Sequence, residues 1–334
     1  MASPFAQLPA AIRAHLGALA EDWPDEARSP CGACPLVADG DAGVAYPFSM
    51  AREARCCTAQ PNLANFLAGR AGDTAVIRAR LANKDGVSAW GIRAVTGYDE
   101  EFPLRAKQGF GRDVGMRCPF WVGGDHACGV WQGRSARCRA FFCRHERGLA
   151  GALSWSQAAG LGVALEAAIA EHFVATLERV PTAAAGPDEL LAWYARCAAA
   201  ADALEAEDAL AIVRAVPPPE SAGDPDRLVT SPRGKLIAKL RVHRVAIADV
   251  LVPAVSAIEH HGDRVLLAGY STFDAVSAPR TVFSLLSRLD GATPWRTALA
   301  ELADPTLDEA LVRELRRVGA LRDPAGSDDP PETE

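Results

Sequence analysis

Eight of the nine cysteines lie within the first 143 residues of this 334-residue chain, and their thiols are the side chains best suited to chemistry. Clustered thiols bind zinc or iron–sulfur clusters, whereas exposed free thiols at such density would be vulnerable to oxidation. We therefore expect eight metal ligands: Cys31, Cys34, Cys56, Cys57, Cys118, Cys128, Cys138 and Cys143.

The spacing of the cysteines bears on how they share metal centres. Cys31 and Cys34 form a C-x2-C pair, which lets one tight turn bring two thiolates to one metal. Cys56 and Cys57 are adjacent, and neighbours in an extended chain point apart, so both reach one centre only if the backbone bends there. Spacing alone leaves structural zinc and iron–sulfur ligation both open; we favour one or two clusters of the 4Fe-4S type, with zinc as the alternative.

Positive charge accompanies the later cysteines. Between Arg105 and Arg147 there are nine Lys or Arg residues and three acids, although the whole chain has a net charge of -7. A thiolate-bound cluster is a buried anionic centre that needs cations and hydrogen-bond donors, but a phosphate-bearing or acidic substrate would suit the same charge. We expect Arg117, Arg134 and Arg139 to contact the cofactor.

The run CPFWVGGDHACGVWQGRSARCRAFFC, residues 118–143, resembles the YkgJ-like family of zinc- or iron-chelating CxxCxxCC proteins. The C-P-F opening at Cys118 and the C-R-x-F ending at Cys138 match the family pattern, whereas Ser135 replaces a usual proline and Cys143 comes one residue late. The resemblance covers residues 31–145 at most. It implies metal chelation by these cysteines and, through the similar cluster of flagellin lysine methylases, methyl transfer as a remote option.

Other polar residues near the cysteines are weaker candidates. His126 and His145 flank cluster cysteines and are candidate ligands or proton donors, with a solvated or supporting role as the alternative. Asp125 and Glu146 are acid–base candidates only by proximity. The chain has no radical-SAM cysteine run, phosphate-binding glycine loop, H-E-x-x-H or G-x-S-x-G pattern.

Composition indicates a folded, cytoplasmic protein. The amino terminus lacks the basic, apolar and small-residue pattern of a secretory signal and predicts a short amphipathic helix. The Ala- and Gly-rich run from Leu149 to Ala170 is interrupted by polar residues, so we expect a packed helix and no membrane partner. Cys197 is expected to be a small buried hydrophobe.

The predicted fold is mainly α with small β elements. We expect a cysteine-rich metal or iron–sulfur module at 1–148, a helical extension packing on it at 149–215, a linker at 216–232, a winged-helix-like binding domain at 233–323 and a disordered acidic tail at 324–334.

The carboxyl-terminal domain predicts a hairpin beside three helices. Two strands, 255–259 and 264–268, flank a turn at 260–263, with the two histidines His260 and His261 at its tip. Thr293 and Pro294 predict the start of the second helix, and Thr306 with Glu309 a capping box for the third, which Gly319 ends.

This region resembles the PqqD-like winged helices that hold leader peptides, through its L-D-G-x-T turn and closing R-x-V-G-A-L. The resemblance implies a peptide or protein partner at the strand edge or third helix. We therefore expect an iron–sulfur protein that gives redox or catalytic chemistry, such as peptide modification, to that partner. The alternatives are a metal- or redox-sensing transcriptional regulator and a zinc-folded scaffold. If the protein is a transcriptional regulator, DNA phosphates would contact seven basic residues: Lys235, Lys239, Arg241, Arg244, Arg313, Arg316 and Arg317.

Overall fold

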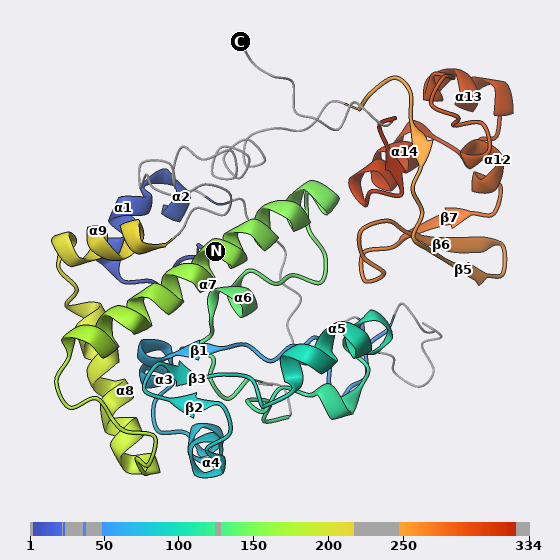
Figure 1. Cartoon of the computed structure of the whole chain (residues 1–334). Helices are drawn as coiled ribbons and strands as arrows, with labels where there is room; N and C mark the ends of the chain where they lie inside the picture. The colour runs from blue at the N-terminus through green and yellow to red at the C-terminus, as the bar shows by residue number, and fades with distance from the viewer. Residues whose placement is uncertain are drawn as a thin grey trace. The chain divides into compact units, whose positions relative to one another are not determined.

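The computed structural model describes residues 3–21, 23, 36–37, 49–123, 128–216 and 247–324. The protein is mainly α with small β elements, as predicted (Figure 1). It divides into two units, Met1–Phe141 with Ser154–Arg241, and Phe142–Leu153 with Val242–Glu334. The segment Phe142–Leu153 therefore groups with the carboxyl-terminal residues, although it lies within our predicted cysteine module and helical extension.

The first unit combines short helices with one small antiparallel sheet of order β1-β3-β2. The strands are β1 (Leu63–Ala64), β2 (Val87–Ser88) and β3 (Gly91–Ile92). Up to Phe141, the helices are α1 (Ala10–Leu16), α2 (Ala18–Glu21), α3 (Asn65–Ala71), α4 (Ala75–Asn83), α5 (Tyr98–Gly109), the 3-10 helix η2 (Val114–Met116) and α6 (Ala136–Arg139).

Three further helices, α7 (Gly148–Thr176), α8 (Pro187–Asp202) and α9 (Ala206–Ala215), confirm the helical periodicity predicted for this region. Pro187 opens α8, where its missing N–H removes no helical hydrogen bond. Helix α7 is long and apolar enough to cross a membrane by length and composition, with a mean hydropathy of 1.4 in its most apolar window, of which 39% is buried. Core helices of soluble proteins meet the same description.

Helices α3 and α8 pack closely and connect the small sheet to the core. Gly69 permits this approach, since a Cβ there would lie 2.0 Å from the carbonyl oxygen of Tyr194. The buried aromatic side chains of α8 donate hydrogen bonds to backbone carbonyls in and just after β2. Trp193 Nε1 donates to Ala89 O at 2.7 Å, and Tyr194 Oη donates to Ser88 O at 2.7 Å. Cys197 is fully buried in the same core, as expected.

Residues 247–324 of the second unit form a three-stranded antiparallel sheet, a two-stranded sheet and three helices (Figure 1). The strands are β4 (Val252–Pro253), β5 (Ala257–His261), β6 (Arg264–Ala268), β7 (Val276–Pro279) and β8 (Leu321–Arg322), with β4 paired to β8 and the others in the order β5-β6-β7. The helices are α12 (Val282–Leu286), α13 (Trp295–Leu302) and α14 (Glu309–Arg317). Trp295, Val312 and Leu315 are buried in its core.

Local details of this unit differ from the sequence prediction. The hairpin turn is Gly262–Asp263, because His260 and His261 pair with β6, and Gly262 has the positive φ of 58° that such a short turn needs. Helix α14 is capped by Asp308, whose carboxylate accepts from Leu311 N at 2.8 Å, and not by Thr306. Gly319, with φ 72°, follows the end of this helix as predicted.

Candidate metal centre

The backbone brings the Cys56–Cys57 pair against Cys118. Residues 52–58 form consecutive turns, and Arg55 has a φ of 49°, which is uncommon for a residue with a side chain. The N–H of Cys118 donates to the carbonyl oxygen of Cys57 at 2.7 Å. The chain is thus bent at the adjacent cysteines, as ligation by that pair requires.

A short antiparallel bridge returns the chain from Cys118 to Cys128. Trp121 pairs with Cys128, and the N–H of Gly129 donates to Phe120 O at 2.8 Å. Trp121 N in turn donates to Cys118 O at 3.0 Å. Residues 120–121 and 128–129 therefore run antiparallel to each other.

Helix α6 carries Cys138, whose N–H donates to Ser135 O at 3.0 Å. The charges of Cys128 and Cys138 each raise the pKa of Cys118, and that of Cys128 raises the pKa of Cys138, so these thiols lie within electrostatic reach of one another. Together with Cys57, which contacts the same core, they form what we call the thiol cluster.

Burial keeps two thiols of the cluster, Cys118 and Cys138, protonated. Desolvation raises the pKa of Cys118 to about 12 and that of Cys138 to about 11. Because the thiolate is the metal-binding form, a metal ion must displace these protons when it binds. Cys118 and Cys138 are therefore neutral thiols at neutral pH until a metal displaces their protons.

The remaining predicted ligands differ in placement. Cys56 is half-buried beside Cys57, Cys143 belongs to the second unit, and Cys31 and Cys34 lie outside the described residues. Cys57, Cys118, Cys138 and Cys197 are free thiols. In that part of the chain, no group of three or more His, Cys, Asp or Glu side chains is arranged to hold a metal ion, so the thiol cluster gathers ligands without forming a finished coordination shell.

Of the three arginines expected at the cofactor, one acts on the cluster directly. The guanidinium of Arg134 lies 3.3 Å from the centroid of the Trp131 ring, and its charge lowers the pKa of Cys138. Arg139 donates two hydrogen bonds to backbone carbonyls of the preceding loop. Arg117 is exposed, and its N–H closes the η2 turn.

Two buried arginines were missed by the sequence analysis. Arg55 is 6% exposed and lies over the Trp121 ring at 5.5 Å; its Nε and Nη1 have no hydrogen-bond partner among the described residues. Arg80 is 4% exposed, donates through Nη2 to two backbone carbonyls and interacts electrostatically with Cys118. Within the described chain, neither side chain forms an ion pair.

These arginines provide a physical test of whether an anionic thiolate centre suits the site. A buried guanidinium without an anion is unfavourable, and burial lowers the pKa of Arg80 accordingly. The charge of Asp85 partly offsets this burial, and deprotonated Cys118, which also lies within electrostatic reach of Arg80, would add further negative charge. The residues present therefore fit a metal held by thiolates.

A buried carboxyl group adjoins the cluster and was also missed. Glu166 on α7 is 3% exposed, and its Oε1 accepts from Ala136 N at 2.6 Å and from Gln7 Nε2 at 2.9 Å. Burial raises the pKa of Glu166 to about 8, and its charge in turn raises the pKa of Cys138. From the sequence alone, Glu166 was noted only as one of the polar residues that interrupt the apolar run from Leu149 to Ala170.

A small cavity of about 110 Å³ lies near the cluster in the first unit, lined among others by Tyr98, Phe102, Arg105 and Met116. Tyr98 Oη accepts from Gln60 N and donates to a backbone carbonyl, while burial raises its pKa to about 12. The charge of Cys118 contributes to this shift, so Tyr98 lies within electrostatic reach of that thiol.

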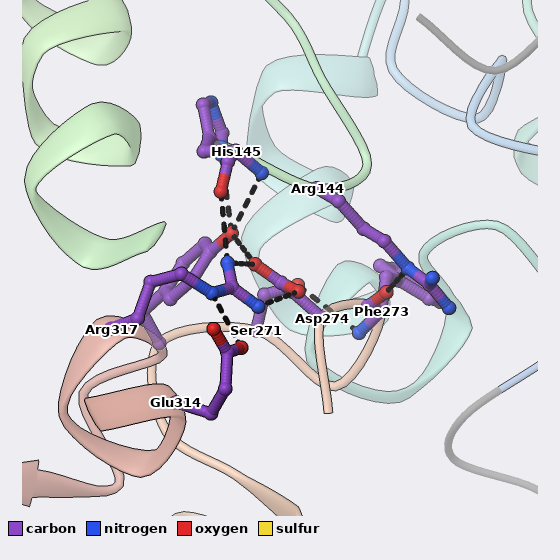
Figure 2. A network of polar contacts seen from close by, with 8 residues as sticks. Arg144, His145, Ser271, Phe273, Asp274, Glu314 and Arg317 are labelled. Atoms are coloured by element: carbon purple, nitrogen blue, oxygen red, sulfur yellow. Dashed lines mark hydrogen bonds and ion pairs between the residues drawn. The ribbon is translucent and has the colours of Figure 1, made fainter. Parts of the chain in front are cut away.

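The candidate acid–base residues near the last cysteine belong to a different environment. His145 lies in the second unit, where its N–H and Nδ1 contact Tyr270 Oη at 3.3 and 3.2 Å (Figure 2). Burial lowers the pKa of His145 to about 4, so the ring is neutral at physiological pH. Glu146 is exposed, and Asp125 and His126 fall outside the described residues.

Asp274 and Arg317 form the centre of that network (Figure 2). Arg317 donates through Nη1 and Nη2 to the Asp274 carboxylate at 2.8 and 2.9 Å and also to His145 O at 2.9 Å, while Tyr270 donates to Asp274 Oδ2 at 2.6 Å. Burial alone would raise the pKa of Asp274, but the hydrogen bonds from Arg317 and Tyr270 hold it below its usual value. Position 148 requires glycine, because a Cβ there would lie only 1.8 Å from Arg317 O and would clash with it.

The arginines of α14 that we considered as phosphate contacts all have acidic partners. Arg313 pairs with Glu309, Arg316 with Asp323, and Arg317 with Asp274 and Glu314. The four other basic residues of that set, at 235, 239, 241 and 244, lie outside the described ranges.

No family model, curated protein or solved structure matches the chain. The two family resemblances read from the sequence therefore stay predictions.

Proposed function

We propose that the first unit is a thiolate metal centre that holds an iron–sulfur cluster and gives redox or catalytic chemistry to a peptide or protein partner. The observation that carries this proposal is that Cys118, Cys128 and Cys138 lie within electrostatic reach of one another, with Cys57 hydrogen-bonded to Cys118 through the backbone and the buried cation Arg80 within electrostatic reach of Cys118. A bound iron–sulfur cluster would accept and donate single electrons.

Each part of the chain has a distinct role in this proposal. The cysteines of the thiol cluster would be the ligands, and Arg134 would offset thiolate charge, as its effect on the pKa of Cys138 indicates. Arg55 and Arg80 would add buried positive charge, which stabilises an anionic centre in a medium of low dielectric constant. A zinc ion on the same four thiolates is the alternative guest.

The second unit would hold the partner as a winged-helix-like domain. Its three-stranded sheet ends at β5, an edge strand whose Ile258 is 47% exposed, and an extended peptide can add to such an edge through main-chain hydrogen bonds. Peptide binding is favoured over DNA binding because the arginines of α14 are already paired with acids.

Cysteine replacement tests the ligand assignment. Cys138→Ser should lower the metal content of the full-length chain purified without oxygen, because it removes a ligand, while Cys197→Ala, which removes a buried thiol from the α8 core, should leave it unchanged. Metal analysis of both variants provides the readout. An unchanged metal content in Cys138→Ser would contradict the proposal.

A further inference from the structure

We infer that Glu166 is the positioning residue that holds Cys138 in place for metal binding. The inference rests on the proposed function. Its structural basis is the hydrogen bond from Ala136 N to Glu166 Oε1, at 2.6 Å, which fixes the start of the helix that carries Cys138.

Helix α6 needs such support from outside. It has only four residues, Ala136–Arg139, and a helix this short is unstable by itself. The N–H of its first residue has no partner within the helix, and Ser135, at the cap position, makes no side-chain capping hydrogen bond. Glu166 supplies that acceptor from 30 residues along the chain.

The contact between α6 and α7 is also close and dry. Ala136 is fully buried and Glu166 is 3% exposed. Gly162, one helical turn before Glu166, lets the two helices approach, since a Cβ there would lie 2.4 Å from the Ala136 Cβ. Gln7 Nε2 donates to the same carboxyl oxygen at 2.9 Å and further restrains it.

Groups that orient a metal ligand from behind commonly change metal affinity by about 10- to 100-fold when they are replaced. We expect the same here, because loss of the Glu166 acceptor leaves the Ala136 N–H buried without a partner and releases α6. Glu166→Leu keeps much of the side-chain volume and removes the acceptor, whereas Glu166→Gln keeps an acceptor oxygen. Glu171→Leu, at an exposed position of the same helix, is the matched control.

The test is anaerobic titration of the full-length, metal-free chain with Co²⁺, followed by thiolate-to-metal absorption and chelator competition. We expect Glu166→Leu to bind Co²⁺ about 10- to 100-fold more weakly, with a changed absorption spectrum. Glu166→Gln and Glu171→Leu should resemble the wild type. Wild-type affinity and spectrum in Glu166→Leu would overturn the inference alone, whereas a wild-type chain that binds neither Co²⁺ nor iron would overturn the proposed function with it.

A measurement on the wild type covers the case in which Glu166→Leu does not fold. The N–H of Ala136 should exchange slowly with solvent in the metal-free chain, because Glu166 accepts its hydrogen bond within a buried contact. Exchange of this N–H at the rate of an unprotected amide would overturn the inference.

Discussion

Buried charges are paired in the second unit and largely unpaired in the first. Asp274 and Arg317 neutralise each other through two hydrogen bonds, and the pKa of Asp274 is lowered (Figure 2). In the first unit, Arg55 is buried without an ion pair in the described chain, and burial raises the pKa of Glu166 to about 8.

This difference separates a structural network from a site prepared for a guest. The Asp274–Arg317 pair is satisfied by the protein itself and needs no ligand. The first unit holds the buried cations Arg55 and Arg80, and burial raises the pKa of the Cys118 and Cys138 thiols, so conversion of these two thiols to thiolates would add negative charge within reach of Arg80. Metal binding is the reaction that produces thiolates in such an environment.

The largest expected effect on stability comes from removing the Asp274–Arg317 ion pair of the second unit. Asp274→Ala leaves Arg317 partly buried without its main partner, which should lower the free energy of unfolding by about 4 kcal/mol. Asp249→Ala, which removes an exposed partner of Arg296, should cost less than about 1 kcal/mol. Urea unfolding of the full-length variants measures both, and equal losses would contradict the distinction.

The next largest effect concerns how the free energy of unfolding depends on pH. The contribution of Glu166 in the first unit and that of Asp274 in the second have opposite signs. The pKa of Glu166 is raised from 4.5 to about 8 on folding, so the folded state keeps a proton that the unfolded chain releases between these values. The free energy of unfolding should therefore fall by roughly 3 kcal/mol between pH 5 and pH 8 through this residue. Asp274, whose pKa is lowered, contributes stability above its ordinary value and loses it in acid.

Comparison of wild type with Glu166→Gln isolates this contribution, because the amide does not titrate. Both proteins, freed of metal, would be unfolded in urea at pH 5 and at pH 8. The wild type should lose more stability than the variant over this interval. The same pH dependence in both would show that Glu166 does not carry the raised pKa.

The smallest effect on stability should come from replacing Arg55. Arg55→Met removes a buried cation that has no ion-pair partner in the described chain, so the metal-free protein should be as stable as the wild type or more stable by about 1 kcal/mol. Arg317→Met should instead destabilise the protein, because it leaves Asp274 buried and unpaired. Thermal unfolding of both variants is the measurement, and a similar loss in the two would indicate that Arg55 has an acidic partner after all.

The sequence predicted well those features that depend on neighbouring residues. The helices after Gly148, the strand 264–268 and the helix stop at Gly319 follow from periodicity and from the conformational needs of proline and glycine. The choice between two nearby residues that can both cap a helix was harder to predict. Asp308 caps α14, while the Thr306 hydroxyl donates to Asp304.

The features that sequence reasoning missed depend on tertiary packing. Glu166 meets Ala136 across 30 residues, and Asp274 meets Arg317 across 43, so no local pattern marks either contact. The cysteines were found because their type alone is informative. Arginine and glutamate are usually exposed, so only the fold can identify the few that are buried.

The central claim is that the thiol cluster binds metal through thiolates. Anaerobic purification of the full-length chain, with analysis of iron, zinc and acid-labile sulfide and an absorption spectrum, tests it most directly. We predict stoichiometric iron with sulfide and a visible thiolate-to-iron absorption. Stoichiometric zinc without sulfide would replace the iron–sulfur cluster by a zinc site, and a chain that retains and takes up neither metal would contradict the claim.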